Sequence, residues 1–480
     1  DRFNIMTLNR RIYQVILLLA GLWLVLELVS RAVAEILWFQ EVGYLQVLLL
    51  RLKTQGLLGV IPTAISAVFL MGNLALARRL KHPTEETKSP ISGALFASVN
   101  LKKTGKNYQL SVAKPPLAFP WLLLLLFGLS SIAGLMVIHC GQLAAGSLAD
   151  FSIAPPIQLE IQSIQQIAVQ LFSNWWQLGL LLGLMLAVII KPDFWLRAIA
   201  LFLSLAIGII AASLWTKVLP YFHHPNFNIN DPIFRQDISF YIFVLPILEL
   251  LALGLTAIFL YGLVSCTLTY LLSGNSLSQG IFLGFSRSQQ RHLYALGAAL
   301  MLASAFRYWL ARYELLYSRG DVTYGANYAD VTVRLPSYGF LSILAVAIPF
   351  GIASLHALLM LWSIFQLKIH NHNLTKIVFS YLIVIFLLII LLPQIVQQLI
   401  VKPNELAREK PYIERSIAFT QQAFDLKKIE VKTFDPAGKL TYADLEKNQL
   451  TISNIRLWDK RPLLQTNRQL QQIRPYYKFL

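Results

Sequence analysis

The sequence predicts an all-α polytopic membrane helix bundle of about nine spans, within a range of seven to nine, followed by the start of an α+β extracytoplasmic domain. Three observations lead to this fold class. Hydrophobic residues make up 56% of the 480 residues and charged residues only 14%, against about 25% charged residues in a typical soluble domain. Apolar runs long enough to cross about 30 Å of hydrocarbon recur along residues 12–400. After residue 400 the composition becomes that of an ordinary soluble protein.

The predicted membrane helical domain covers residues 12–400 and follows a short basic tail, residues 1–11. Its nine apolar ranges contain only eight charged side chains, as expected for segments surrounded by lipid. The fourth range is the weakest. However, residues 170–215 would be about 69 Å long as one helix, so two crossings or a re-entrant hairpin are expected there. The nine ranges are 12–38, 55–77, 120–141, 170–190, 194–215, 239–272, 292–313, 338–366 and 376–400.

Lys and Arg residues in the loops predict the orientation of the bundle. The N-terminus and alternate loops carry 15 of them and the opposite loops carry 6, so the N-terminus is predicted to be cytoplasmic. Residues 401–480 are then the start of an extracytoplasmic domain. Because the chain begins at Asp1 rather than at a Met, we expect it to be a piece of a longer protein. The expected location is the cell membrane, with membrane lipids as partners and protein partners on the extracytoplasmic side.

Eight basic residues between the second and third ranges contribute much of the net charge of +17. Nucleic-acid binding needs basic residues organised on a folded surface, and this segment shows no such pattern. We interpret the segment as a topology signal beside anionic lipid and predict no nucleic-acid partner. The eight residues are Arg78, Arg79, Lys81, Lys88, Lys102, Lys103, Lys106 and Lys114.

Three elements are predicted in residues 401–480. Apolar residues at helical spacing from Tyr412 to Phe424 predict an amphipathic helix that follows Pro411. Residues 429–434 alternate between polar and apolar, which is typical of a half-buried strand and is the reason for the α+β assignment. Asp459, three residues before Pro462, marks the start of a further helix.

Four segments of the chain resemble, in the same order, uncharacterised protein family 0182 (UPF0182), large multi-span membrane proteins of actinobacteria, cyanobacteria and related bacteria. The resemblance implies a membrane half followed by a much longer extracytoplasmic part, in the plasma membrane or, in a cyanobacterium, the thylakoid membrane. It implies no assigned reaction, substrate or cofactor. The segments are DPIFRQDISFYIFVLP (231–246), WLARYELLYSRGDVTYGANYADVTVRLP (309–336), KPNELAREKPYIER (402–415) and NIRLWDKRPLLQTNRQLQQIRPYY (454–477).

On the predicted topology the first three motifs fall on the outer side of the membrane, where we expect them to converge. Asp237 is expected to cap the helix of the sixth range, and Asn404 the helix after the last range, in a rigid junction onto which the fourth motif docks. His223 and His224 with the nearby aspartates offer metal ligands without a diagnostic spacing, so no metal and no cofactor is predicted. The candidate outer-face residues are Asp231, Asp237, Arg312, Glu314, Asp321, Tyr328, Asp330, Lys402, Asn404, Glu405, Arg456, Trp458 and Asp459.

Charged residues inside the apolar ranges form a second candidate group. Glu27, Arg31 and Glu35 are spaced by four, so they share one face of the first helix and partly neutralise each other. Arg307 cannot face lipid cheaply and needs a partner, for which Glu249, Glu27 or Glu35 could serve. A clamp between helices is the favoured interpretation, and a polar pathway for an ion or a head group is the alternative.

Three functions remain open at this point. The first is a non-enzymatic envelope scaffold or docking protein that anchors a large outer domain. The second is a transporter or exporter that uses Arg307 and the Glu27, Arg31 and Glu35 face. The third is an outer-leaflet membrane enzyme. No nucleophile beside a base and no glycine loop for phosphate is found in these motifs, so an enzyme is not expected.

Overall fold

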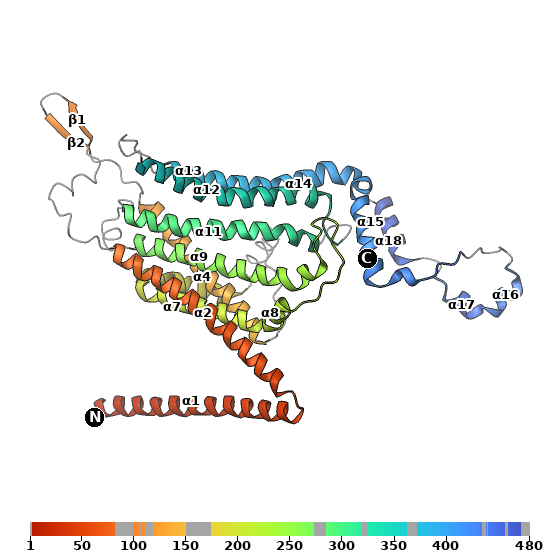
Figure 1. Ribbon diagram of the computed structural model, residues 1–480, viewed down its shortest axis with the longest axis horizontal. Coiled ribbons are helices and arrows are strands. Elements are labelled where there is room, and N and C mark those ends of the chain that lie inside the picture. The colour runs from red at the N-terminus through yellow and green to blue at the C-terminus, as the bar shows by residue number, and fades with distance from the viewer. Residues whose placement is uncertain are drawn as a thin grey trace. The chain divides into compact units, whose positions relative to one another are not determined.

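The structure is a computed structural model in which the chain divides into two compact units, Asp1–Ser416 and Ile417–Leu480, each described here by itself. Figure 1 shows the order of the elements along the chain. The structure describes residues 2–81, 100–104, 107–111, 119–149, 174–272, 285–318, 324–361, 372–433, 438, 440–456 and 459–471.

In the residues that the structure describes, the elements of the first unit are helical apart from one short hairpin, β1 (Asn100–Thr104) paired antiparallel with β2 (Asn107–Ser111). Short π turns, Phe240–Val244 and Asp330–Arg334, precede α9 and α12. Its helices are α1 (Arg2–Glu41), α2 (Leu45–Lys81), α4 (Phe119–Ala149), α6 (Trp175–Ile190), α7 (Pro192–Ser213), α8 (Trp215–Phe222), α9 (Leu245–Leu271), α11 (Arg287–Glu314), α12 (Leu335–Leu361), α13 (His372–Ile385) and α14 (Leu392–Val396). The helix α15 (Glu405–Ala423) begins in this unit and ends in the second.

Within the part of the chain that the structure describes, seven helices are long and apolar enough to cross a membrane. They are α2, α4, α7, α9, α11, α12 and the continuous helical stretch Phe379–Ala423, which contains the end of α13, α14 and α15. A membrane protein is therefore the correct class, but the predicted count of nine spans is not confirmed. The helix α6 has only 16 residues, fewer than the roughly 20 that a bilayer requires.

The weak fourth range and the fifth range form two separate helices. The helix α6 ends at Ile190 and α7 begins at Pro192, so Lys191 alone separates them. Proline suits the first turn of a helix because its missing N–H would have no partner there. Arg78 at the end of α2 binds this turn through the carbonyl of Asp193 at 2.9 Å and its carboxylate at 3.0 Å. The turn therefore lies at the same end of the bundle as the basic end of α2.

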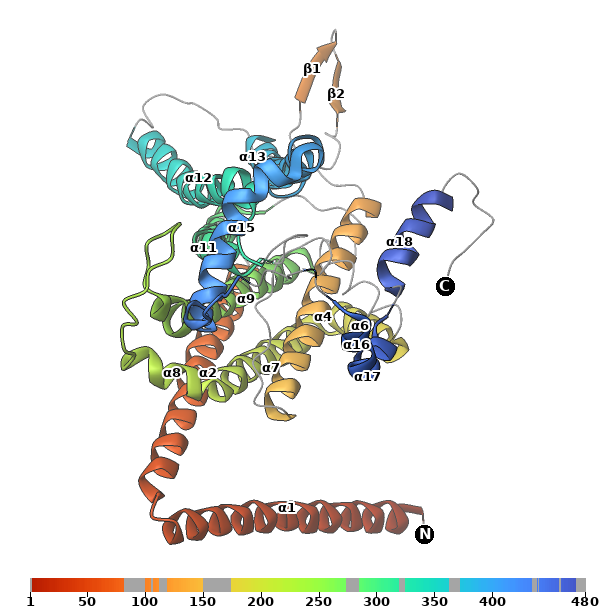
Figure 2. The same cartoon turned by 90° about the vertical axis from the view of Figure 1, so that its right-hand side faces the viewer.

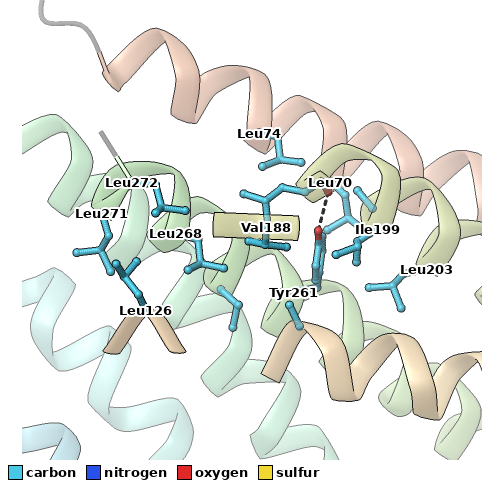
Figure 3. Packing of buried hydrophobic residues seen from close by; sticks show 14 of the residues in the cluster. Leu70, Leu74, Leu126, Val188, Ile199, Leu203, Tyr261, Leu268, Leu271 and Leu272 are labelled. Carbon is cyan, nitrogen blue, oxygen red and sulfur yellow. Dashed lines mark hydrogen bonds between the residues drawn. The ribbon is translucent and has the colours of Figure 1, made fainter. Parts of the chain in front are cut away.

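The helix α9 lies between the pair α11 and α12 on one side and the group α2, α4 and α7 on the other (Figure 2). The main core forms between α9 and that group, where Leu70 of α2, Ile199 of α7 and Leu268 of α9 are at most 3% exposed. Tyr261 of α9 is fully buried in this core, and its hydroxyl donates to the carbonyl of Leu196 at 2.6 Å (Figure 3). Burial without that acceptor would cost free energy, so the hydrogen bond fixes how α9 docks on α7.

The closest helix contact is between α2 and α7, at Gly208. A Cβ atom built on Gly208 would lie 1.9 Å from Thr63 Oγ1 and 2.5 Å from the carbonyl oxygen of Gly59. Small residues at such crossings let two helix backbones approach closely, which is a common way to pack helices in membranes. Position 208 therefore accepts glycine and no larger residue without a shift of one helix.

The second unit corrects the predicted fold class. Its described residues form α16 (Tyr442–Lys447), α17 (Gln449–Asn454), α18 (Lys460–Gln471) and a short 3-10 turn, Leu426–Lys428. Residues 429–433 form no strand, so the α+β assignment is not supported. Alternation yields a strand only where a second strand supplies hydrogen bonds, and the described neighbours of this segment are helical. The helix predicted around residues 412–424 is found as α15, but it begins earlier, at Glu405, and contains Pro411 rather than following it. Asp459 accepts the Arg461 N–H at 3.2 Å as α18 begins.

Candidate functional site

Three buried carboxylates lie in the loops and helix ends that follow α8, α11 and α14. Asp231, Asp330 and Glu409 are 7%, 1% and 3% exposed. Hydrogen bonds from their neighbours join the first three motifs of the sequence, and we call Asp231, Asp330, Glu409 and their hydrogen-bonding partners the junction network. Burial of a carboxylate is costly unless its oxygens accept hydrogen bonds, so the partners of each of the three show what it does.

Asp231 organises the loop that leads into α9. Its carboxylate accepts the backbone N–H groups of Ile233 at 2.8 Å, Phe234 at 2.7 Å and Gln236 at 2.9 Å, and the hydroxyl of Tyr241 at 2.7 Å. Four donors on one carboxylate leave little capacity for a metal or a substrate. In the described ranges no group of three His, Cys, Asp or Glu residues is placed to hold a metal ion.

Asp237 closes the same loop from the other side. Its Oδ1 accepts the N–H of Ser239 at 2.8 Å and that of Phe227 at 3.2 Å, and residues Asn230 and Asp237 form an antiparallel bridge. The sequence predicted Asp237 as a helix cap, and the Ser239 contact has that character. Hydrogen bonds from the hydroxyl and N–H of Ser239, followed by that from Phe227, lower the pKa of Asp237 from 3.8 to about 2.

Asp237 is therefore expected to make stability fall in acid. A carboxyl whose pKa is lower in the folded state contributes stability above its unfolded pKa of about 3.9 and loses it as the pH falls towards the folded value. Thermal unfolding in detergent should show a fall in midpoint between pH 4 and pH 2 that is smaller in Asp237→Asn. Equal acid dependence in the two proteins would contradict this role of Asp237.

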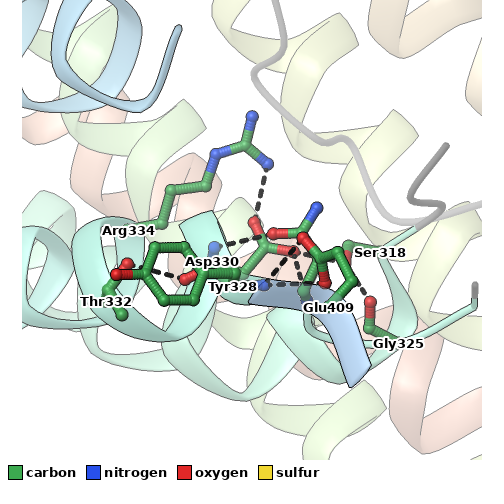
Figure 4. Close-up of polar contacts among 8 residues, drawn as sticks. Ser318, Gly325, Tyr328, Asp330, Thr332, Arg334 and Glu409 are labelled. Atoms are coloured by element: carbon green, nitrogen blue, oxygen red, sulfur yellow. Dashed lines mark hydrogen bonds and ion pairs between the residues drawn. The ribbon is translucent and has the colours of Figure 1, made fainter. Parts of the chain in front are cut away.

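Asp330 fastens the loop between α11 and α12 (Figure 4). Its Oδ2 accepts the hydroxyl of Ser318 at 2.8 Å and the N–H of Asn327 at 3.1 Å. The Asn327 side chain in turn accepts the N–H of Asp330 at 2.8 Å, which makes a reciprocal cap. Arg334, one turn later, donates to Oδ1 at 3.0 Å. Three of the protein's own donors thus bind this carboxylate.

Glu409 joins α15 to the same loop. Its two carboxylate oxygens accept the N–H of Tyr328 at 3.3 and 3.2 Å (Figure 4). The Tyr328 and Tyr412 rings meet edge to face at 6.4 Å. The guanidinium of Arg408 lies 5.5 Å from the centre of the Tyr328 ring. The sequence analysis did not single out Glu409. Its helical spacing to Tyr412 and Ile413, on the apolar face of the amphipathic helix, is the signal that would have placed it against the bundle.

The hydroxyl of Tyr317 connects these parts. It donates to the carbonyl of Tyr241 at 3.2 Å, and Tyr241 is the residue whose own hydroxyl donates to Asp231. Tyr317 directly precedes Ser318, the donor to Asp330. A continuous path of hydrogen bonds and adjacent residues therefore runs from Asp231 through Asp330 to Glu409.

Arg307 has a partner that the sequence analysis did not choose. It forms a bidentate ion pair with Glu314 of the same helix, with Nη2 3.0 Å from Oε2 and a second, shorter contact through Nη1. Glu314 is 7% exposed. Residues seven apart lie on nearly the same side of a helix, about 10 Å along its axis, which the long Arg and Glu side chains span together. Glu249 of α9 is close enough to interact electrostatically with Arg307 and with Lys217 of α8.

Two of the three partners proposed for Arg307, Glu27 and Glu35, are wrong, because each pairs with another cation. Glu27 binds Arg31 one turn away at 2.8 Å, as their spacing predicts. Glu35 binds Arg51 at 3.0 Å, which links α1 to α2. An acid pairs with the nearest cation that it reaches without added desolvation. Arg31 lies on α1 with both glutamates, and Arg51 lies near the start of α2, the next helix.

The remaining candidate residues serve local structure or belong to other parts of the chain. Arg312 lies 3.6 Å over the ring of Trp309. Asn404 makes no capping bond, contrary to expectation, because Lys402–Asn404 form a 3-10 turn that runs directly into Glu405 and α15. Arg456 and Asp459 lie in the second unit, so their docking on the junction stays a prediction. Asp321 and Trp458 lie outside the described residues.

Comparison with known proteins gives one consistent result. The sequence profile described as uncharacterised protein family (UPF0182) matches residues 12–480. Among curated relatives, the UPF0182 protein alr1037 of Nostoc sp. is 47% identical over 97% of this chain and 48% of its own length. The UPF0182 proteins of Trichodesmium erythraeum and Microcystis aeruginosa are 42% and 39% identical, over 95% and 97% of this chain and 48% of their own lengths. The chain thus spans about half the length of these relatives. No solved structure matches it.

Proposed function

The chain belongs to the uncharacterised protein family UPF0182, and from that premise we propose that it is a non-enzymatic membrane scaffold. In this proposal the helix bundle anchors the protein, and the junction network holds the polypeptide that leaves the last apolar helix in a fixed direction. That polypeptide presents a docking surface for partner proteins or lipids on the predicted extracytoplasmic side.

The hydrogen bonding of the three buried carboxylates supports a structural role over a catalytic one. A general acid or base must exchange its proton with a substrate, so at least one of its oxygens has to be reachable. Asp231 and Asp330 are bound by four donors and three donors. Donors fixed in this way stabilise one loop conformation and resist proton exchange.

The contact between Glu409 and Tyr328 is the observation that carries the proposal. The helix that begins with α13 continues through α14 and short turns into α15. Without a further contact, the segment after Val401 could bend at the 3-10 turn Lys402–Asn404. Glu409 binds the N–H at the start of the helix that leads into α12, and thereby sets the direction in which α15 leaves the bundle.

This predicts that removing the Glu409 carboxylate loosens α15 without unfolding the bundle. Spin labels at Lys410 and Ile343, in a background without Cys140 and Cys266, should give a narrow distance distribution in the parent protein. The distribution should broaden in Glu409→Ala. The matched control is Glu414→Ala, which removes an exposed glutamate from the same helix.

An unchanged distribution in Glu409→Ala would contradict the proposed junction. The docking role is tested in a full-length UPF0182 protein that contains this chain, purified in mild detergent. Partners that co-purify with the parent should be lost from Glu409→Ala and kept by Glu414→Ala. Retention of the same partners by both variants would count against a scaffold that depends on the direction of α15.

The proposed orientation places the N-terminus in the cytoplasm and α15 outside it, and it can be tested by labelling. Lys410 and Arg79 are both exposed. In intact cells an impermeant maleimide is expected to react with Lys410→Cys, and to react with Arg79→Cys only after permeabilisation. The reverse pattern would place α15 on the cytoplasmic side and remove the proposed outer docking surface.

A transporter is the second candidate, and one observation favours it. Glu249 of α9 interacts electrostatically with Lys217 of α8 and with Arg307 of α11, so charges of both signs act on one another in the bundle, two of them within apolar helices. Charged residues within membrane spans often line a pathway for an ion or a polar substrate. The Arg307 variants described in the Discussion separate the two functions.

A further inference from the structure

Three hydrogen-bonded side chains tie α2, α9 and α11 together near the basic end of α2. The hydroxyl of Tyr270 on α9 lies 2.7 Å from Nδ1 of His292 on α11. Nε2 of the same ring lies 2.9 Å from Oδ1 of Asn73 on α2. Tyr270 is 2% exposed and His292 is 8% exposed, so the ring between them is shielded from water. We call Tyr270, His292 and Asn73 the histidine clasp.

The partners of the clasp fix the protonation state of the His292 ring. Nδ2 of Asn73 donates to the carbonyl of Phe69 at 2.7 Å, so the atom that faces His292 is the amide oxygen Oδ1. An amide oxygen only accepts, and Nε2 must therefore carry a hydrogen. The Tyr270 hydroxyl has no other hydrogen-bond partner among the described residues, so its hydrogen points at Nδ1 and Nδ1 must be unprotonated. The neutral Nε2–H tautomer satisfies all of these contacts.

A second proton on the ring would break the clasp. Once protonated, Nδ1 is a donor that faces the Tyr270 hydroxyl, which can then only accept and must leave its own hydrogen unpaired in a buried place. The new charge would also lack an acid. The helices α2 and α12 contain no acidic residue. The acids of α9 and α11, Glu249 and Glu314, lie near the opposite ends of those helices, about 30 Å away along their axes.

The other ionisable groups at this end of the bundle do not compensate a charge on His292. The one nearby carboxylate, Asp193 of α7, is 3.0 Å from Arg78 and is thus already paired. The remaining groups are cations, a second histidine and weak acids. They are Arg78, Arg79 and Lys81 on α2, Cys266 and Tyr270 on α9, Arg287, Arg291 and Tyr294 on α11, and His356 on α12. A proton on His292 would therefore be added to a positively charged region.

We propose that the histidine clasp is an acid-sensitive switch at the predicted cytoplasmic end of the bundle. With a neutral ring it holds α9 and α11 against α2. Uptake of a proton from the aqueous phase at Nδ1 of His292 removes the acceptor of Tyr270 and loosens the three helices at this end. Histidine is the side chain whose charge ordinarily changes closest to neutral pH, so the response belongs to mild acid. The inference goes beyond the scaffold function and does not depend on it.

Cys266 is a native reporter of this opening, because it is fully buried and its Sγ lies 3.7 Å from the carbonyl oxygen of Asn73. The whole chain with Cys140→Ser is placed in mild detergent, and the rate of reaction of Cys266 with a pyridyl disulfide is measured at about pH 7.5 and about pH 5.5. Division by the rate of the chain unfolded in denaturant at the same pH removes the pH dependence of the thiol itself. The normalised rate should rise by about tenfold or more in acid, the effect of leaving a buried group without its partner.

His292→Gln separates this histidine from every other titrating group. A glutamine amide donates through nitrogen and accepts through oxygen, as the neutral ring does, but it gains no proton in this pH range. Its normalised rate should match that of the parent at neutral pH and stay low in acid. The matched control is His139→Gln, which removes a partly buried histidine of α4 and should keep the full acid response. Tyr270→Phe should raise the rate already at neutral pH and reduce the further rise in acid.

A parent protein whose normalised rate is the same at both pH values would overturn the proposal, as would an acid response in His292→Gln equal to that of the parent. If His292→Gln does not fold, its rate is high at both pH values, and nitrogen NMR of the ring-labelled parent decides instead. The His292 signals are assigned by their change in Tyr270→Phe. They should show the Nε2–H form at neutral pH and the doubly protonated ring in acid. An Nδ1–H or a charged ring at neutral pH would contradict the switch.

Discussion

Replacing Arg307 by Met should lower the free energy of unfolding by about 3 to 5 kcal/mol, the usual effect of removing one partner from a buried ion pair. The carboxylate of Glu314, which is 7% exposed, would lose its bidentate partner and remain buried with a charge. Unfolding in a mixed detergent and denaturant series, followed by circular dichroism, measures the change. Arg312→Met is the matched control, because Arg312 is a neighbouring arginine that stacks on Trp309 rather than pairing with an acid.

A second substitution shows whether the loss comes from the uncompensated charge. Arg307→Met combined with Glu314→Gln should recover most of the stability, because a neutral amide costs less to bury than a carboxylate. Losses that simply add in the double variant would mean that the two side chains do not act as a pair.

The same variants separate the two candidate functions. A transporter that moves a polar group past Arg307 loses flux in both the single and the double variant, whatever their stability. A scaffold loses stability in the single variant and regains both stability and partner binding in the double variant. Because the double variant is expected to be nearly as stable as the parent, its flux and partner binding can be measured without the effect of lost stability.

Substituting Gly208 by Ala should destabilise the bundle by about 1 to 3 kcal/mol through overpacking, although alanine favours an isolated helix by about 1 kcal/mol over glycine. The new Cβ would lie 2.5 Å from the backbone oxygen of Gly59 and 1.9 Å from Thr63 Oγ1. A backbone atom cannot rotate away as the end of a side chain can, so α2 and α7 must separate. Larger residues such as leucine should prevent the folded bundle from forming.

The control for this prediction is a glycine in the same kind of helix with free space around it. A Cβ on Gly254 of α9 would meet no atom within 4 Å, so Gly254→Ala should be neutral or slightly stabilising. Thermal unfolding of both variants in the same detergent is the measurement. Equal stability of Gly208→Ala and the parent would show that the crossing of α2 and α7 is looser than the structure indicates.

Several features were predictable because they depend on one segment at a time. Charged residues are scarce in the apolar ranges, which predicts the membrane class, and four ordered motifs predicted the family. Spacing along one helix was enough to pair Glu27 with Arg31. The turn at Lys191 and Pro192 could be expected from length and from the chemistry of proline.

Other features depended on neighbours that the sequence does not specify. The segment 429–433 alternates in polarity but forms no strand, because alternation describes a half-buried surface and not the presence of a pairing partner. Asn404 was expected to cap a new helix, but the last apolar helix continues through it into α15. The pairing of Arg307 with Glu314 is a further example, because several glutamates could have been its partner and the sequence did not distinguish among them.

The sequence alone determined that this chain is a membrane protein of UPF0182 with helices in most of the expected places, because hydrophobicity and helical periodicity act along the chain. Only the tertiary structure decided which carboxylates hold the junction network, that Glu409 ties α15 to the α11–α12 loop, and that Gly208 sits at the closest helix crossing. The physical reason is that hydrogen bonds and close packing act between residues distant in sequence, so they are settled only when the helices take their places beside one another.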